Sequence, residues 1–152
     1  MATVISHSPA ETESVGEEWG RAAQSGWVIG LSGDLGAGKT QLVKGVARGL
    51  GTFDPVHSPT FALLNEYHSG RLSLFHLDLY RLDTRDQIVG AGLEPYFYQP
   101  AGVAIIEWAE RWFGEEPGFK FQVSGFPALC RFVRIETLGE TDRRITHEDF
   151  GA

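Results

Sequence analysis

A glycine-rich stretch of eight residues, Gly33–Thr40, constrains the fold of this chain more than any other feature. It reads GDLGAGKT: a glycine, four residues, Gly-Lys and a hydroxyl. An apolar run over residues 27–31 precedes it, and apolar residues at helical spacing follow it as far as Leu50. Glycines let successive backbone N–H groups curl around an anion, and a helix N-terminus adds positive potential. This context therefore predicts a phosphate-binding loop between a buried strand and a helix.

Two side chains of this loop have a predicted task. Lys39 is placed to reach the outer phosphates of a nucleotide, and the Thr40 hydroxyl is a ligand for the Mg²⁺ that bridges them. A glycine-rich turn that matches by chance is the plain alternative, and the flanking strand and helix argue against it. The sequence thus predicts nucleotide binding.

Strands and helices alternate around the loop. Residues 3–6 are expected to form a short strand, and Ser8-Pro9-Ala10-Glu11 is a capping box that opens a helix running to about Gln24. The helix after the loop is expected to end at Gly49 and Gly51. This order predicts an α/β fold, a P-loop NTPase-like three-layer sandwich with a central, mainly parallel sheet and antiparallel edge strands.

A second strong signal lies at residues 102–108, GVAIIEW. Four consecutive apolar residues predict a strand buried on both faces, and Glu107 follows at its carboxyl end, where ligands bind in open α/β sheets. This is the pattern of a Walker B strand, whose acid holds Mg²⁺ directly or through water. Trp108 is expected either near the nucleotide or in the core.

Residues 61–67 and 72–80 are expected to form an antiparallel hairpin that turns at Ser69-Gly70. Alternation places His76 and Asp78 on one face of the second strand. A buried carboxylate requires a partner, so Asp78 is expected either to serve the nucleotide site or to be satisfied by His76, Arg81 or backbone.

The preceding loop, residues 54–61, contains two prolines and several hydroxyls. Such a loop brings a threonine to the metal and last phosphate in some nucleotide hydrolases. It is equally consistent with an ordinary connector, and the spacing does not decide between the two interpretations.

The remaining segments carry less chemistry. A capping box at Thr84 predicts a short helix that halts at Gly90, followed by a turn over residues 94–98. Strands are expected at residues 119–124 and 129–137, and the polar end, residues 143–152, is expected to fray.

Length and composition favour one domain over residues 1–152, with the 42% apolar and 22% charged residues of a soluble globular protein. Neither a membrane-spanning run nor a basic and apolar leader is apparent. The single cysteine, Cys130, has no internal disulfide partner and is expected to be buried and inert. These features predict a cytoplasmic protein without membrane association.

The formal net charge of −7 bears on partners, because 20 acidic residues face 13 basic ones. Proteins that grip nucleic acid unaided usually carry a basic surplus. Any link to nucleic acid is therefore expected to run through a partner.

Four segments, in this order, resemble the TsaE family of small bacterial P-loop ATPases, which are needed to make threonylcarbamoyladenosine in tRNA. They are GDLGAGKT at 33–40, VHSPTF at 56–61, HLDLYR at 76–81 and IEW at 106–108. The first is common to many nucleotide hydrolases, whereas the second and third are far more particular. The resemblance covers about residues 10–110.

The resemblance implies a site. The residues that would hold the phosphates are Leu35, Gly36, Ala37, Gly38, Lys39 and Thr40. Thr40 and Glu107 would hold Mg²⁺, Asp78 would be needed for hydrolysis, and Trp108 would sit beside the nucleotide. Ser58–Phe61 would act like a switch loop, with Thr60 its active member. The implied catalytic set is Asp78, Glu107, Lys39 and Thr60, and the implied cofactors are ATP and Mg²⁺.

The resemblance also implies partners, the TsaB and TsaD proteins, with tRNA contacted only indirectly through their complex. Two departures stand out: Gln41 replaces a threonine that is usual there, and residues 112–129 match no family motif.

Two alternatives remain open from the sequence. A small-molecule kinase uses the same phosphate loop, although no Arg-rich lid is apparent. A nucleotide-gated binding module with negligible turnover is the other. A GTPase is disfavoured because the guanine-reading Asn-Lys-x-Asp motif is missing; the only asparagine, Asn65, precedes Glu66.

Overall fold

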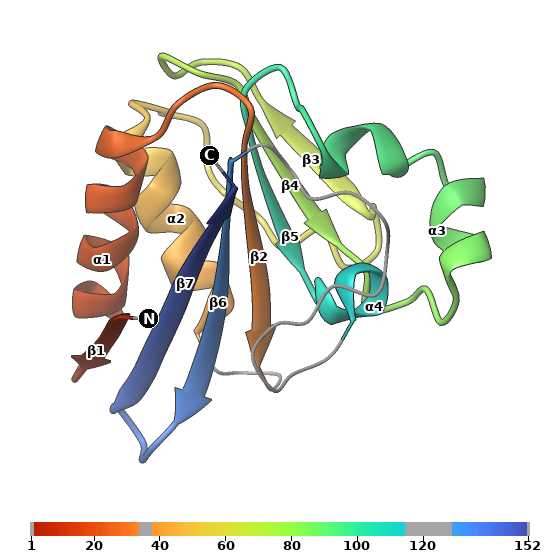
Figure 1. Cartoon of the computed structure of the whole chain (residues 1–152). Coiled ribbons are helices and arrows are strands. Elements are labelled where there is room, and N and C mark those ends of the chain that lie inside the picture. Colours follow the sequence, from red (N-terminus) through yellow and green to blue (C-terminus); the bar gives the residue numbers. More distant parts are fainter. Residues whose placement is uncertain (1, 34–37, 115–128, 152) are drawn as a thin grey trace.

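The computed structural model describes residues 2–33, 38–114 and 129–151. Within these ranges seven strands form one sheet in the order β1-β7-β6-β2-β5-β4-β3 (Figure 1). The strands are β1 (Ala2–Ser6), β2 (Trp27–Gly33), β3 (Leu64–Tyr67), β4 (Leu74–Asp78), β5 (Val103–Glu107), β6 (Leu129–Thr137) and β7 (Arg143–Gly151). The helices are α1 (Pro9–Ala22), α2 (Lys39–Gly49), α3 (Arg85–Gly90), the 3-10 turn η1 (Glu94–Phe97) and α4 (Glu110–Phe113).

The centre of the sheet is parallel and its edges are antiparallel. Strands β6, β2, β5 and β4 run parallel, whereas β7 and β1 on one side and β3 on the other are antiparallel to their neighbours. Every residue of β4 and β5 is buried, as expected for strands covered on both faces. The predicted fold class is confirmed.

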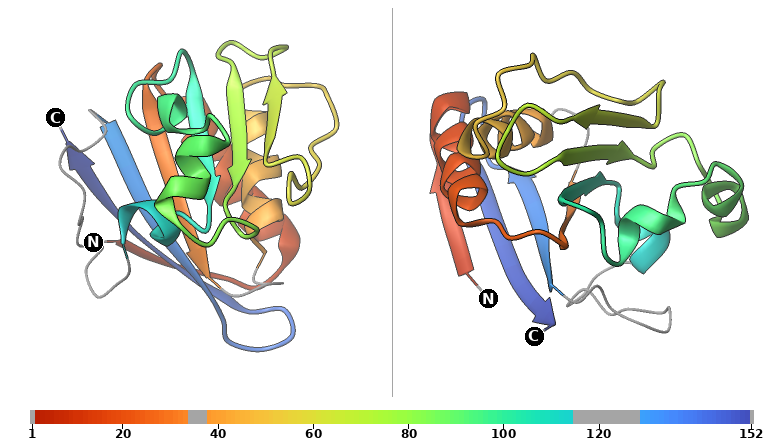
Figure 2. Two further views of the ribbon diagram at one scale, coloured as in Figure 1. Left: turned by 90° about the vertical axis from the view of Figure 1, so that its right-hand side faces the viewer. Right: turned by 90° about the horizontal axis from the view of Figure 1, so that it is seen from above.

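Helices cover both faces of this sheet (Figure 2). Alternate residues of β2 face opposite layers: Ile29 and Leu31 pack with α1 and α2, and Val28 packs with the residues around α3, η1 and α4. Cys130 belongs to the second layer, is 2% exposed and forms no disulfide, so its predicted burial is confirmed.

Helices α1 and α2 approach one another through glycines. A β-carbon on Gly16 of α1 would overlap the carbonyl oxygen of Leu42, and one on Gly45 of α2 would overlap that of Glu13. Ser8 caps α1 by accepting a hydrogen bond of 3.1 Å from the Glu11 N–H. This close packing brings the start of α1 beside the start of α2.

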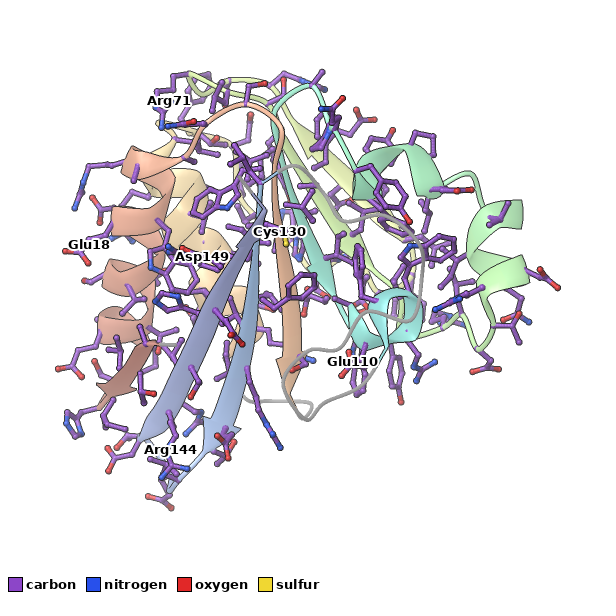
Figure 3. All side chains as sticks on the ribbon, in the orientation of Figure 1. Glu18, Arg71, Glu110, Cys130, Arg144 and Asp149 are labelled. Carbon is purple, nitrogen blue, oxygen red and sulfur yellow. The ribbon has the colours of Figure 1, made fainter. Side chains whose placement is uncertain are left out.

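An arginine closes the other end of α1. The Arg71 guanidinium, from the turn between β3 and β4, donates to the carbonyls of Gly20, Arg21 and Ala23 at 2.8, 3.0 and 2.8 Å (Figure 3). These are carbonyls that the end of a helix leaves without intrahelical partners. The contact ties the β3–β4 hairpin to α1.

The β3–β4 hairpin is confirmed, but β3 is shorter than predicted. Residues 61–63 belong to a turn, because Leu63 has a left-handed φ of 68° and its N–H donates to the Pro59 carbonyl at 2.6 Å. Phe61 is therefore 85% exposed and lies outside the sheet.

The prediction that residues 143–152 fray is wrong. Strand β7 pairs with β6 over residues 143–151 and, on its other side, with β1 over residues 143–147. Ile145, the third residue of the strand, is fully buried. The polar sequence of this segment does not indicate a strand, because the strand is stabilised by pairing with β6 and β1. The expected strand at 119–124 lies outside the described residues.

The shorter predicted elements agree with the structure. Thr84 caps α3 by accepting from the Gln87 N–H at 3.2 Å, and η1 supplies the turn expected over residues 94–98. No helix among the described residues is long and apolar enough to cross a membrane.

Candidate nucleotide-binding site

A cavity of about 420 Å³ opens at the carboxyl ends of the central strands. Its volume lies within the roughly 300–1,000 Å³ of small-molecule pockets, and its location is the usual one for ligands in open α/β sheets. The start of α2, the ends of β4 and β5, the loop before β3, the start of α1 and the β6–β7 turn all contribute. The lining residues are Ser8, Pro9, Thr12, Gly38, Lys39, Thr40, Gln41, Ser58, Thr60, Asp78, Glu107, Trp108, Glu140, Thr141 and Arg143.

The start of α2 forms one wall. Gly38 is the N-cap residue in a left-handed conformation (φ 95°), and no side chain among the described residues caps this end with a hydrogen bond. The first turn carries no acidic residue either. Its backbone donors are therefore suited to an anion. The expected phosphate contacts of Leu35, Gly36 and Ala37 lie outside the described residues.

Lys39 lies across the base of the loop and is 5% exposed. Its ammonium donates a hydrogen bond of 2.8 Å to the Gly33 carbonyl at the end of β2. The same nitrogen lies 4.2 Å from the centroid of the Trp108 ring, within cation–π distance. The charge is thus held between the end of β2 and the residue that follows β5.

Trp108 has a backbone conformation that is rare for a bulky side chain, with φ at 59°. Its ring is half-buried, lines the cavity and packs against Tyr80 at 5.1 Å between centroids. Trp108 thus lines the cavity and also packs against the second core layer.

Glu107, at the end of β5, is 4% exposed and still lines the cavity. Its Oε2 lies 2.6 Å from Nε2 of His76, which is fully buried on the neighbouring strand β4. Of the expected partners of Asp78, the backbone is confirmed, through the Tyr80 N–H, whereas His76 pairs with Glu107 instead. The parallel register of β4 and β5, which places Asp78 opposite Glu107, brings these groups together.

Asp78 has two other partners. Its carboxylate accepts a hydrogen bond of 3.0 Å from the Thr60 hydroxyl and one of 2.8 Å from the Tyr80 N–H. Burial raises the pKa of this carboxyl, and the nearby Glu107 charge raises it further, while its two donors and Lys39 oppose the shift. A buried carboxylate beside another carboxylate is typical of a functional site.

The loop before β3 reaches the cavity through two hydroxyls. Ser58 and Thr60 both line it, and their side-chain oxygens lie 2.8 Å apart. Of the two interpretations left open by the sequence, this geometry favours a role at the cavity over a plain connector.

The opposite wall was not predicted. It consists of residues from the start of α1 and from the β6–β7 turn: Ser8, Pro9, Thr12, Glu140, Thr141 and Arg143. The segment Gly139–Asp142 could have indicated a tight turn between two strands. Because residues 143–152 were expected to fray, no second strand and no such turn were predicted.

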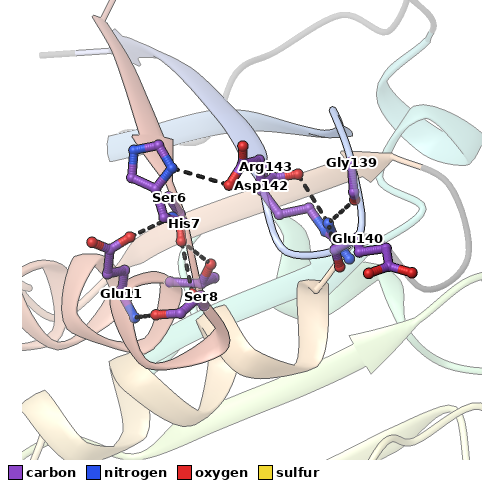
Figure 4. A network of polar contacts seen from close by, with 9 residues as sticks. Ser6, His7, Ser8, Glu11, Gly139, Glu140, Asp142 and Arg143 are labelled. Atoms are coloured by element: carbon purple, nitrogen blue, oxygen red, sulfur yellow. Dashed lines mark hydrogen bonds and ion pairs between the residues drawn. The ribbon is translucent and has the colours of Figure 1, made fainter.

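A polar network fixes this wall (Figure 4). The Arg143 guanidinium donates to the carbonyls of Gly139 and Asp142, both at 2.9 Å, and so braces its own turn. The His7 imidazole lies 3.0 Å from Oδ1 of Asp142 and joins the turn to the start of α1. The Asp142 carboxylate raises the pKa of His7.

Comparison with known proteins decides the family. The family model described as "Threonylcarbamoyl adenosine biosynthesis protein TsaE" matches residues 6–131. The chain belongs to the TsaE family. The match extends beyond the four motifs that carry the resemblance and includes the start of β6.

Two relatives illustrate the similarity over nearly the whole chain. The tRNA threonylcarbamoyladenosine biosynthesis protein TsaE of Treponema pallidum is 42% identical over 142 residues, which cover 93% of this chain and 96% of that protein. The protein of the same name from Bacillus subtilis is 37% identical over 144 residues, covering 95% and 83%. The family is thus one of tRNA threonylcarbamoyladenosine biosynthesis.

The fold of this TsaE-family chain also has a solved relative. The crystal structure of YdiB from Bacillus subtilis matches it with a TM-score of 0.74 at 32% sequence identity. The match covers 96% of this chain and 83% of YdiB. The arrangement of the sheet and of its covering helices is therefore similar in this chain and in YdiB.

Proposed function

We propose that this TsaE-family chain binds ATP with Mg²⁺ and hydrolyses it, in tRNA threonylcarbamoyladenosine biosynthesis together with TsaB and TsaD. One observation carries the proposal: Lys39, Thr40, Thr60, Asp78 and Glu107 come from four separate segments and line a single cavity. Family membership supplies the pathway.

The donors at this cavity fit a magnesium-bound phosphate. The described residues contain no group of three or more His, Cys, Asp or Glu side chains that would hold a metal by themselves. Thr40 and Glu107 instead offer a hydroxyl and a carboxylate, which are oxygen ligands of the kind Mg²⁺ prefers, with phosphate oxygens completing the set. Bound Mg²⁺ would neutralise charge on the phosphate oxygens.

Two features of the chain receive the phosphates. The start of α2 presents backbone N–H groups, and the ammonium of Lys39, the first residue of α2, is hydrogen-bonded to the Gly33 carbonyl at the end of β2. A triphosphate would compete with the Gly33 carbonyl for this ammonium, since a charged acceptor makes the stronger hydrogen bond.

Asp78 is the candidate to orient the attacking water. The Thr60 hydroxyl and the Tyr80 N–H hold its carboxylate at the cavity wall. Its raised pKa makes it a better proton acceptor than an ordinary aspartate. Thr60 then positions Asp78 and, with Ser58, carries the loop that responds to the last phosphate.

The nucleoside occupies the remaining part of the cavity in this proposal. With the phosphates at α2, the ribose and base extend toward Ser8 and Pro9 on one side and Thr141 and Arg143 on the other. The preference for ATP is supported by the missing guanine-reading motif and by the family resemblance.

Contact with tRNA is proposed to run through TsaB and TsaD. The net charge of −7 disfavours direct binding of tRNA, because such binding depends on neutralising phosphates. The nucleotide cycle of this chain would then act on the partner complex.

Phosphate release from ATP, measured with the chain alone and with TsaB and TsaD, tests the proposal. We expect slow release alone, an increase with the partners, and loss in Glu107→Ala and in Thr40→Ala. Glu66→Ala removes an exposed carboxylate on β3 and serves as the matched control.

Three outcomes would contradict the proposal. Release that is unchanged in Glu107→Ala would remove this residue from the mechanism. Transfer of the phosphoryl group to a metabolite would favour a kinase. Tight ATP binding without turnover, even with the partners, would favour a nucleotide-gated binding module.

A further inference from the structure

His76 contacts Glu107 from the interior of the protein. The imidazole is fully buried and does not line the cavity, whereas the Glu107 carboxylate does. The 2.6 Å contact between Nε2 and Oε2 therefore joins the carboxylate to a side chain that does not line the cavity. Within the described residues, His76 is the only side chain at hydrogen-bond distance from this carboxylate.

The contact assigns a tautomer to His76 when Glu107 is ionised. An imidazole nitrogen this close to an ionised carboxylate oxygen donates a hydrogen to it, because two bare acceptors repel. Nδ1 of His76 is buried and has no hydrogen-bond partner in the described part of the chain. A single hydrogen bond thus orients the ring, and the same hydrogen bond orients the carboxylate.

The sheet makes this pairing rigid. Strands β4 and β5 are parallel neighbours with His76 opposite Ile105 and Asp78 opposite Glu107. Both strands are completely buried, so neither backbone is free to shift. Asp78 accepts hydrogen bonds from Thr60 and Tyr80, so the His76–Glu107 contact does not involve it.

We propose that His76 is a positioning residue for the Glu107 carboxylate. Its Nε2–H holds Oε2 and leaves the other oxygen for the metal that accompanies ATP. Ligating carboxylates depend on such supporting hydrogen bonds, whose loss typically weakens metal binding roughly 10- to 100-fold. This inference rests on the proposed function, because the metal concerned is the one bound with the nucleotide.

The test measures metal affinity. Mn²⁺ is titrated by electron paramagnetic resonance into the full chain saturated with ADP, and ADP affinity is measured separately with EDTA. In His76→Leu, which removes the donor, we expect Mn²⁺ affinity to fall roughly 10- to 100-fold and metal-free ADP affinity to stay unchanged. A residue with a merely structural role would alter both affinities or neither.

Two further variants keep the test decisive if His76→Leu fails to fold. The side-chain nitrogen of Gln lies as many bonds from Cα as Nε2 of histidine, so His76→Gln should restore most of the Mn²⁺ affinity. The shorter side chain in His76→Asn falls short of Glu107 and should not. His68→Leu replaces an exposed histidine outside the cavity and should behave as wild type.

Two results would overturn the inference, and they are distinguishable. Wild-type protein that binds ADP and Mn²⁺ together, with His76→Gln and His76→Asn equal in Mn²⁺ affinity, would show that the hydrogen bond does not position Glu107. Wild-type protein that binds no ADP or no Mn²⁺ would remove the proposed nucleotide site and the role of His76 with it.

Discussion

The Thr60 hydroxyl donates a hydrogen bond of 3.0 Å to the Asp78 carboxylate, although the two residues lie 18 positions apart. Thr60 precedes β3 and Asp78 ends β4, so one hydrogen bond fastens a loop to the end of a central strand. The contact makes the orientation of the loop depend on the state of the carboxylate. A ligand that competes for Thr60 would break this contact while the Asp78 N–H still donates to the Leu63 carbonyl at 3.0 Å.

This contact predicts how Thr60 variants behave. Thr60→Val keeps the shape of the side chain but removes the donor, so we expect partner-stimulated ATP hydrolysis to fall roughly tenfold or more, since misplaced catalytic groups are costly. ATP affinity, measured by equilibrium dialysis, should change little. Thr60→Ser keeps the hydroxyl and should retain most of the hydrolysis; equal losses in both variants would contradict a hydrogen-bonding role.

Asp78→Asn is predicted to separate stability from activity. Burial raises the folded-state pKa of Asp78, so the folded chain retains a proton that the unfolded chain releases. The resulting stability is present at low pH and is lost as pH rises from the ordinary value of 3.8 through the raised folded pKa. At neutral pH the variant should therefore unfold at the same or higher urea concentration than wild type.

The pH dependence supplies the control for Asp78→Asn. Its stability advantage should shrink as the pH is lowered toward the ordinary value of 3.8, because wild-type Asp78 is then protonated in both states. Hydrolysis should be lost at neutral pH. An advantage that is constant across this range would mean that the carboxylate charge is not its source.

Nucleotide binding is predicted to change the fluorescence of Trp108. Of the four tryptophans, all within the described residues, Trp108 alone lines the cavity, and the Lys39 ammonium lies 4.2 Å from its ring. Phosphates that attract Lys39 would change the surroundings of this indole. The emission change on adding ATP should disappear in Trp108→Phe and persist in Trp27→Phe; its persistence in Trp108→Phe would place the signal elsewhere.

The helix contact that positions α1 is predicted to be intolerant of added volume. Gly45→Ala would place a methyl group against the Glu13 carbonyl and should lower the free energy of unfolding by about 1–3 kcal/mol. Gly90→Ala is the matched control, since a β-carbon there meets nothing within 4 Å. Urea denaturation should show the control within about 1 kcal/mol of wild type, and similar losses in both variants would contradict the packing argument.

The sequence predicted the parts of the site that follow strand ends. A buried strand, a glycine-rich loop and a helix placed Lys39 and Thr40 together, and the apolar run ending in Glu107 pointed to the same edge of the sheet. Because parallel strands end at the same edge of a sheet, these two segments were expected to meet there. These residues are therefore predictable from local pattern plus one topological rule.

Two features depended on pairing between distant strands and escaped prediction. His76 contacts Glu107 only because β4 and β5 are neighbours in a particular register, and no local pattern records that register. The wall formed by Thr141 and Arg143 exists because β7 pairs on both edges, whereas its own sequence is polar. That the chain is one domain remains a prediction.

The position of β7 between β6 and β1 has a consequence for synthesis on the ribosome. Residues 2–6 leave the exit tunnel long before their pairing partner, residues 143–147. A nascent chain that already displays the glycine-rich loop still lacks Thr141 and Arg143, so its ligand cavity stays open on one side. The cavity is thus assembled only after residues 141–147 have been synthesised and β7 has paired.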